Sequence, residues 1–166
     1  LWTVEISGKR MKVWAFIAIL GFSRYMTVRI MTSCDLGHTL EAMRDVYEAF
    51  GGVPRRTTSD NPKVFSIGAH KYEPILNPAY ERFASYYGTV VECLPPRAPE
   101  KKGKVERPVS YVRRLLESYA GDRAEISSIQ AHMDGKVAIA NERRHGTTGE
   151  RPVDRFVTEE KPLLRP

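Results

Sequence analysis

Residues 97–114 read RAPEKKGKVERPVSYVRR and place two carboxylates, Glu100 and Glu106, inside a strongly basic run, with Glu106 at its centre. The basic side chains of this run are Arg97, Lys101, Lys102, Lys104, Arg107, Arg113 and Arg114. From the middle of the run onward, apolar residues recur in steps of four and three at Val105, Val109, Val112, Leu116 and Tyr119. This spacing predicts a helix with one buried face, and the rest of the chain is interpreted around it.

Glu106 projects along the same edge of the predicted apolar stripe as Lys102 and Arg113, on a helical wheel of about 100° per residue. This edge is the border between core and solvent, where an acid is held by packing and still reaches a ligand. A carboxylate kept ionised among many cations suits a metal ion that binds phosphate. The alternative is an amphipathic helix with a solvated charged face.

Pro108 decides where this helix is expected to begin. Proline lacks an N–H and clashes with the preceding turn inside a helix, so the sequence predicts a start near Lys104 or Val105. Glu106 would then lie in the first turn, where the helix macrodipole favours its ionised form.

The length, composition and net charge of the chain indicate one domain with a polyanionic partner. A length of 166 residues, 42% of them hydrophobic and 28% charged, is ordinary for a globular domain. The net charge of +6 and the pI near 9.4 favour nucleic acid, because the excess is concentrated in residues 97–114. Cys34, Cys93 and the four scattered histidines lack the spacing of a disulfide framework or a zinc site.

The termini and the hydropathy predict a cytoplasmic protein. No apolar run approaches the roughly 20 residues needed to cross a bilayer, and no signal peptide opens the chain. The chain starts without methionine and is interpreted as an excised fragment. A reducing setting without a membrane partner fits these observations.

The order of elements predicts a mixed α/β sheet. Three strands, at residues 2–6, 11–20 and 25–31, are joined by short turns and form an antiparallel meander. Asp35 caps a helix that ends at Gly51. The elements expected after it are strand 55–59, a mobile loop over 61–75, helix 78–87, strand 89–93, the Glu106 helix and a final helix over 125–141.

Asp60 comes directly after the strand at residues 55–59 and before Asn61 and Pro62. In mixed α/β sheets, sites lie where strands end and loops open. Asp60 is therefore a candidate site residue. The alternative is an aspartate that only forms the turn.

Three motifs together resemble IstA-type insertion-sequence transposases, whose catalytic core is of the retroviral-integrase superfamily. They are FGGVPRR at residues 50–56, leading to Ser59-Asp60-Asn61, then KGKVER at 102–107 and NERRHGTTGERP at 141–152. The resemblance covers nearly the whole chain with the motifs in order.

The resemblance implies an RNase H-like mixed five-stranded sheet, three antiparallel strands then two parallel ones, flanked by helices. Three acids would hold two divalent ions, Mg²⁺ or Mn²⁺, with Asp60 second and Glu106 third. The implied activity is cleavage of a phosphodiester at an element end, followed by transfer of the freed 3′ hydroxyl to target DNA. Residues 1–120 would form the catalytic core, and 121–166 a C-terminal helix and basic tail.

The implied partners are DNA, further copies of the chain assembled on it, and a helper ATPase, in the bacterial cytoplasm at the nucleoid. Backbone contacts to DNA are expected from the basic side chains Arg97, Lys101, Lys102, Lys104, Arg107, Arg113 and Arg114. Lys102 and Arg113 would lie near the scissile phosphate. His145 is expected to be structural, because two-metal chemistry does not require a histidine base.

One position departs from the family pattern. The first acid should stand immediately before Trp2, but Leu1 occupies that place and leucine cannot ligate a metal. Glu5, on the same side of a strand, would lie roughly 13 Å away, too far to share the ions. Either an artificial or truncated start replaced the acid, or the gene encodes a dead copy. In both cases the chain as written is expected to be catalytically impaired.

Two rival functions stay open from the sequence. One is a degenerate core that only binds DNA or oligomerises. The other is a related metal-dependent nuclease that cuts DNA without joining it.

Overall fold

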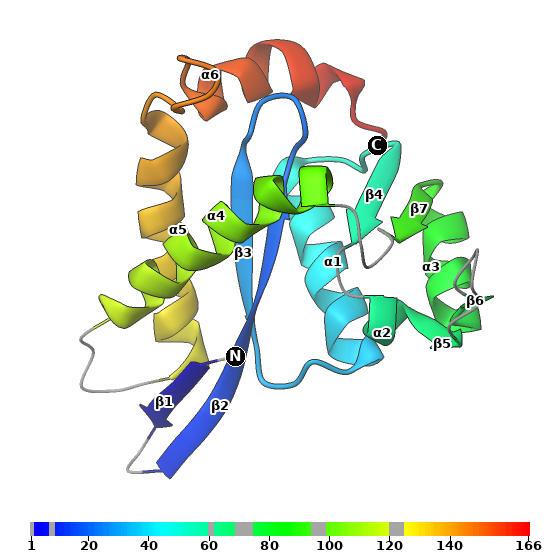
Figure 1. Cartoon of the computed structure of the whole chain (residues 1–166), viewed down its shortest axis with the longest axis horizontal. Coiled ribbons are helices and arrows are strands. Elements are labelled where there is room, and N and C mark those ends of the chain that lie inside the picture. The colour runs from blue at the N-terminus through cyan, green and yellow to red at the C-terminus, as the bar shows by residue number, and fades with distance from the viewer. Residues whose placement is uncertain (1, 7–8, 60–61, 69–74, 94–98, 120–124) are drawn as a thin grey trace.

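The computed structural model describes residues 2–6, 9–59, 62–68, 75–93, 99–119 and 125–166 (Figure 1). The strands are β1 Trp2–Ile6, β2 Lys9–Ile19, β3 Met26–Met31, β4 Arg56–Ser59, β5 Ser66–Gly68, β6 Ile75–Leu76 and β7 Val90–Cys93. The α-helices are α1 Leu36–Phe50, α2 Pro62–Phe65, α3 Pro78–Tyr87, α4 Pro99–Glu117, α5 Ile126–Glu142 and α6 Pro152–Arg155. A π-helical turn, Phe156–Glu160, and a 3₁₀ turn, Lys161–Leu163, follow α6.

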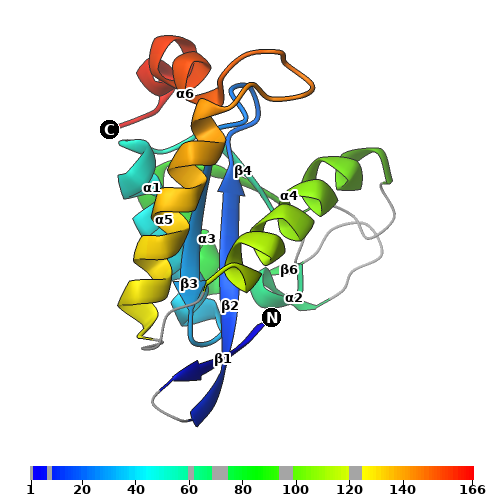
Figure 2. The same ribbon diagram turned by 90° about the vertical axis from the view of Figure 1, so that its left-hand side faces the viewer.

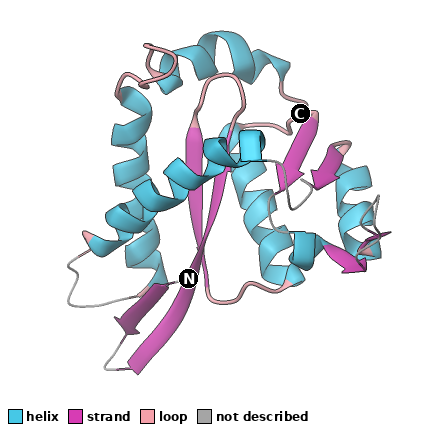
Figure 3. Cartoon of the chain, in the orientation of Figure 1, coloured by secondary structure: helices cyan, strands magenta, loops and turns pink. Residues whose placement is uncertain are grey.

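The described strands form an antiparallel meander, a separate parallel pair and a small antiparallel pair, β5–β6 (Figure 3). In the meander, β1 pairs with the first half of β2, Trp2 opposite Val13, and β3 pairs with the second half, Trp14 opposite Met31. The parallel pair is β4–β7, with Ser59 opposite Cys93. The prediction of three antiparallel strands followed by two parallel ones is confirmed. The prediction that they form one continuous sheet is not met by the described residues, where the two groups of strands stay apart.

Helices cover both faces of the meander, with α1 and α4 on opposite sides of β2 (Figure 2). On one face α4 and α5 build a core around Val112, Ile129 and Met133. The core on the other face is formed by α1, α3 and the C-terminal turns, and includes Tyr47 and Phe156. No helix in the described part of the chain is long and apolar enough to cross a membrane.

The predicted ends of α1 are confirmed. The Asp35 carboxylate accepts a hydrogen bond from the backbone N–H of His38 at 2.9 Å and contacts its imidazole at 2.8 Å. The hydroxyl of Ser33 and these contacts to His38 lower the pKa of Asp35, and the carboxylate raises the pKa of His38. At the other end, Gly51 has a φ of 71° and its N–H donates to the Glu48 carbonyl, which closes the helix.

The predicted start of α4 is wrong. The helix begins at Pro99, and Pro108 lies inside it. Buried packing of the C-terminal half, with Val112 1% and Leu116 4% exposed, offsets the hydrogen bond that proline removes. Glu106 is therefore seven residues inside the helix, and the expected support from the helix N-terminus does not apply.

The predicted mobile loop over residues 61–75 is also wrong where the structure describes it. Pro62 begins the short helix α2, and β5 pairs with β6 in an antiparallel ladder. The anchor is Phe65, 3% exposed, whose ring stacks on Tyr80 with centroids 4.2 Å apart. A single buried aromatic gives no periodic signal, so the pattern of the sequence did not show this element.

The turn between β2 and β3 is held by the last part of the chain. The Glu160 carboxylate accepts hydrogen bonds from the backbone N–H groups of Phe22 and Ser23, at 3.3 and 2.9 Å. Nearby, Val53 exchanges backbone hydrogen bonds with Arg165. The C-terminal turns are therefore an integral layer of the fold.

Asn141 joins the end of α5 to the start of β3. Its side chain accepts from the N–H of Met26 at 2.9 Å and donates to the carbonyl of Met26 at 2.8 Å, and it is 4% exposed. Asn141→Ala leaves both buried backbone groups without a partner, so we expect a loss of about 2–3 kcal/mol in the free energy of unfolding by urea denaturation. The exposed neighbour Glu142, changed to alanine, is the control and should leave it within about 0.5 kcal/mol. An equal effect of both changes would contradict this role of Asn141.

Candidate functional site

The described elements next to the two predicted acids meet at one groove. Glu106 lies in α4, and Asp60 follows Ser59, the last residue of β4. Asp60 itself and the Leu1 position lie outside the described residues.

The groove has a volume of about 530 Å³ and is bounded by β2, β4, α1 and α4. Helix α4 contributes Pro108 and Val109, which follow Glu106 by two and three residues. Strand β4 contributes Arg56, Thr57 and Thr58, the last being two residues before Asp60. The structure thus brings together the strand that leads to one predicted acid and the helix that carries the other.

A hydroxyl network fixes β4 to its neighbours. The hydroxyl of Tyr47 lies 3.0 Å from that of Thr57, which lies 3.1 Å from that of Thr89. Burial raises the pKa of Tyr47, so its phenol stays protonated at neutral pH. On the exposed side, Arg56 pairs with Glu92 at 3.0 Å. These contacts tie β4 to α1 and to the β7 side of the sheet, a few residues before the predicted acid.

The predicted set of metal ligands lacks its first acid in this sequence. Carboxylate oxygens are the ligands that Mg²⁺ prefers, so the side chains of Asp60 and Glu106 are of the right chemical type for a magnesium site. Leu1, at the position expected for the first acid, does not fit, because leucine cannot ligate a metal. Among the residues that the structure describes, no three His, Cys, Asp or Glu side chains are grouped to hold an ion.

The predicted DNA-contacting side chains follow α4. Arg113 and Arg114 are exposed near its C-terminal end, available to a polyanion. The backbone of Lys101, Lys102, Lys104 and Arg107 lies in the first half of the same helix. Arg97 lies outside the described residues.

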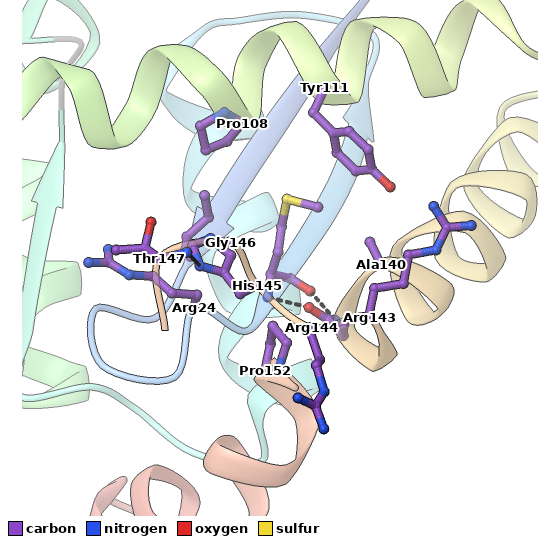
Figure 4. Close-up of a pocket in the computed structure, with 13 residues that line it drawn as sticks. Arg24, Pro108, Tyr111, Ala140, Arg143, Arg144, His145, Gly146, Thr147 and Pro152 are labelled. Carbon is purple, nitrogen blue, oxygen red and sulfur yellow. Dashed lines mark hydrogen bonds between the residues drawn. The ribbon is translucent and has the colours of Figure 1, made fainter. Parts of the chain in front are cut away.

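A second pocket, of about 690 Å³, was not predicted from the sequence (Figure 4). Pro108 and Tyr111 of α4 face the segment at His145, and Arg24 lies to one side. Burial, Arg24 and Arg155 lower the pKa of His145, so the neutral imidazole is favoured in this electropositive site.

Three arginines around this pocket form no ion pair within the described part of the chain. Among the described residues, no carboxylate forms an ion pair with Arg24, Arg143 or Arg144. The motif at residues 141–152 drew attention to this segment in the sequence. Nothing in the sequence indicated that Arg24, from the distant turn between β2 and β3, lines the same pocket. Arg24 has a φ of 65°, in the left-handed region, which no pattern around it indicated.

Solved structures define the class of fold. The catalytic core domain of BIV integrase matches with a TM-score of 0.65, over 97% of this chain and 93% of that one, at 17% identity. The HTLV-2 integrase catalytic core domain, in a structure with magnesium, matches with a TM-score of 0.62, over 93% and 90% of the two chains, at 14% identity. The chain therefore has an integrase-core-like α/β fold.

Sequence relatives are transposases. A putative transposase for insertion sequence element IS5376 of Geobacillus stearothermophilus is 34% identical over 163 residues, 96% of this chain and 40% of the relative. The transposase for insertion sequence element IS21 of Pseudomonas aeruginosa is 27% identical over 161 residues, 96% of this chain and 41% of the relative. No model of a protein family matches the sequence.

The chain is a homologue of IS21-type insertion-sequence transposases with the fold of an integrase core, and the resemblance seen in its motifs is confirmed. It spans about 40% of the length of these two relatives.

Proposed function

We propose that the chain is the catalytic core of a DNA transposase, which cleaves a phosphodiester at an element end and transfers the 3′ hydroxyl to target DNA. The observation that carries this proposal is the shared groove, to which β4 and α4 bring the neighbours of Asp60 and Glu106. The homology to insertion-sequence transposases supports the same chemistry.

Asp60 and Glu106 are the proposed metal ligands. Two divalent ions, when bound, activate the attacking oxygen and stabilise the leaving oxygen. The protein's part is to supply anionic oxygens at fixed positions, and the hydroxyl network behind β4 supports such positioning. Because Leu1 removes one ligand, we propose that this chain as written is impaired.

DNA would lie along the basic face that the sequence predicts for α4, where Arg113 and Arg114 are exposed, with backbone phosphates near Lys102 and Arg113. We further propose that several copies assemble on DNA and that a helper ATPase takes part. The same basic face supports a second candidate, a degenerate core that binds DNA without reacting.

A joining assay separates these functions. The chain carrying Leu1→Asp is incubated with element-end DNA, target DNA and Mg²⁺, and the products are sized on a denaturing gel. A strand longer than either substrate supports the transposase. Shortened strands alone would indicate a nuclease, and unchanged DNA with retained binding would indicate a core that only binds; either result overturns the proposal.

Replacing both Lys102 and Arg113 with alanine is expected to reduce the salt dependence of DNA binding. Each lost phosphate contact lowers the slope of log K against log salt by about 0.9, so the double variant should lose close to two. Fluorescence anisotropy across a salt series measures this slope. Lys136, an exposed cation on α5, changed to alanine, is the control. An unchanged slope in the double variant would remove both residues from the interface.

A further inference from the structure

We propose that the pocket of about 690 Å³ binds one unpaired nucleotide of a DNA strand, with the phosphate on Arg24 and the base against Tyr111. The inference rests on the proposed function, because it extends the path of DNA beyond the groove of the predicted acids. The side chains that the sequence predicts for DNA lie on or before α4. This site, in contrast, is built largely from the β2–β3 turn and the end of α5.

The pocket adjoins the groove. Ile19, Arg24 and Pro108 line both cavities, so the two share a wall. Pro108 follows the predicted metal ligand Glu106 by two residues in α4. A strand with a phosphodiester in the groove would therefore reach the pocket with a neighbouring nucleotide.

The lining of the pocket is apolar in one part and cationic in another. Its apolar side chains are Ile19, Met26, Pro108, Tyr111 and Ala140, and its arginines are Arg24, Arg143 and Arg144. None of the described residues that line it is acidic. Arg24 and Arg143 lie on opposite sides, with Tyr111 between the levels of α4 and the segment at His145 (Figure 4). Such a lining suits a ligand that carries an anion beside a flat, largely apolar ring system, as a nucleotide does.

The volume of the pocket agrees with a ligand of this size. Sites for small molecules and cofactors usually enclose about 300–1,000 Å³, and this pocket falls within that range. A base inside a duplex is paired and stacked, so it cannot enter a pocket without leaving the helix. The nucleotide in the pocket must therefore be unpaired.

Arg24 is the residue that we assign to the phosphate. Its side chain is half-buried, and no carboxylate in the described part of the chain pairs with it. A half-buried guanidinium without an anion is unfavourable, and a phosphate oxygen would supply the missing partner.

The backbone of Arg24 supports a role in binding. Its φ of 65° is a conformation that glycine adopts without steric cost. The turn is fixed around it, because the Glu160 carboxylate accepts from the N–H groups of Phe22 and Ser23 and the Ser23 hydroxyl accepts from the N–H of Tyr25 at 3.0 Å. Strained backbone positions of this kind are common at ligand sites. The fold thus holds an arginine at the pocket where glycine would be less strained.

Tyr111 is the residue that we assign to the base. It lies one turn after Pro108 on the same side of α4 and is half-buried, packed in part against the core that includes Val112. The core contact positions the ring, and the ring also lines the pocket. Stacking of a base on an aromatic side chain accepts every base, so this contact would not make binding depend on sequence.

Fluorescence anisotropy tests the proposal with two labelled single strands of about ten nucleotides, an oligothymidylate and an abasic strand with the same number of phosphates, without added metal. We expect this 166-residue chain to bind the oligothymidylate about tenfold more tightly, because of the stacked base. Tyr111→Leu, which keeps an apolar side chain, should bind both strands equally. Tyr111→Phe should retain the preference, which separates stacking from any loss of packing.

Arg24→Asn is expected to weaken binding of both strands equally and to lower the slope of log K against log salt by about 0.7, the value for one contact to single-stranded DNA. Asparagine is chosen because it accepts a positive φ. Arg82→Gln is the matched control, since Arg82 is an exposed arginine of α3 that does not line the pocket, and it should leave both affinities and the slope unchanged.

Equal binding of the two strands by the original chain would overturn the proposal, and so would a preference that Tyr111→Leu retains. The joining assay on the Leu1→Asp chain is independent of both results. Joined DNA without a base preference would refute the pocket site alone. A base preference that depends on Tyr111, in a chain that joins no DNA, would uphold the pocket site and refute the transposase activity.

Discussion

Glu106→Gln, made in a chain that also carries Leu1→Asp, is expected to reduce the rate of DNA strand transfer by about a thousandfold or more. Glutamine keeps the shape of the side chain and removes the negative charge that a divalent ion requires. The rate is measured as joined product against time under single-turnover conditions. Glu117→Gln, at the exposed end of the same helix, should keep the rate of the Leu1→Asp parent.

Metal binding should follow the same pattern. Titration calorimetry with Mn²⁺, in the presence of element-end DNA, is expected to show a site in Leu1→Asp that is absent from the original chain and lost again in the Glu106→Gln double variant. A site equally strong in all three proteins would place the metal elsewhere. Loss of joining with retained metal binding would make Glu106 a DNA-positioning residue.

Phe156→Ala is expected to lower the free energy of unfolding by about 3–5 kcal/mol, the largest stability effect foreseen for this protein. Phe156 is 5% exposed, and its ring stacks on Tyr25 with centroids 4.3 Å apart while also contacting Phe50. Removing the ring leaves a cavity between the β2–β3 turn and α1 that the surrounding rings cannot fill.

Urea denaturation measures this effect, and Val157→Ala is the matched control because Val157 is 54% exposed. A loss below about 1 kcal/mol for Phe156→Ala would mean that the C-terminal turns are an appendage that the core does not need.

Local signals in the sequence predicted the structure well. Asp35 and Gly51 mark the ends of α1, and Asn77 and Gly88 those of α3, because caps and left-handed glycines act on neighbouring residues. The same holds for the order of the strands. Each of these features is determined by a few consecutive residues, so it can be recognised directly in the sequence.

The predictions were wrong where contacts between residues far apart in the sequence determine the local structure. Pro108 is a poor residue for a helix interior, but Val112 and Leu116 pack into the core from the same helix and keep it continuous. Val109, expected on the buried face, is 43% exposed, because it faces the groove beside β2. Phe65 similarly orders α2 through one long-range ring contact.

Part of the candidate site could be predicted from the sequence. The motif around Glu106 predicts an acid there, and the structure shows its helix meeting β4, but the contribution of Arg24 to a neighbouring pocket depends on tertiary contact alone. The roles of Glu106, Asp60 and the first-acid position stay predictions.

The contact between the Glu160 carboxylate and the turn at Phe22 and Ser23 can form only late in synthesis. The two ends of this contact are 138 residues apart in the chain. A ribosome adding 5–20 residues per second makes Glu160 on the order of ten seconds after the turn it caps. Throughout that interval the β2–β3 hairpin, which contains the apolar run VWAFIAIL at residues 13–20, leaves the ribosome without its closing contact. The nascent chain is then exposed to aggregation, and chaperone binding to this hairpin would have most effect.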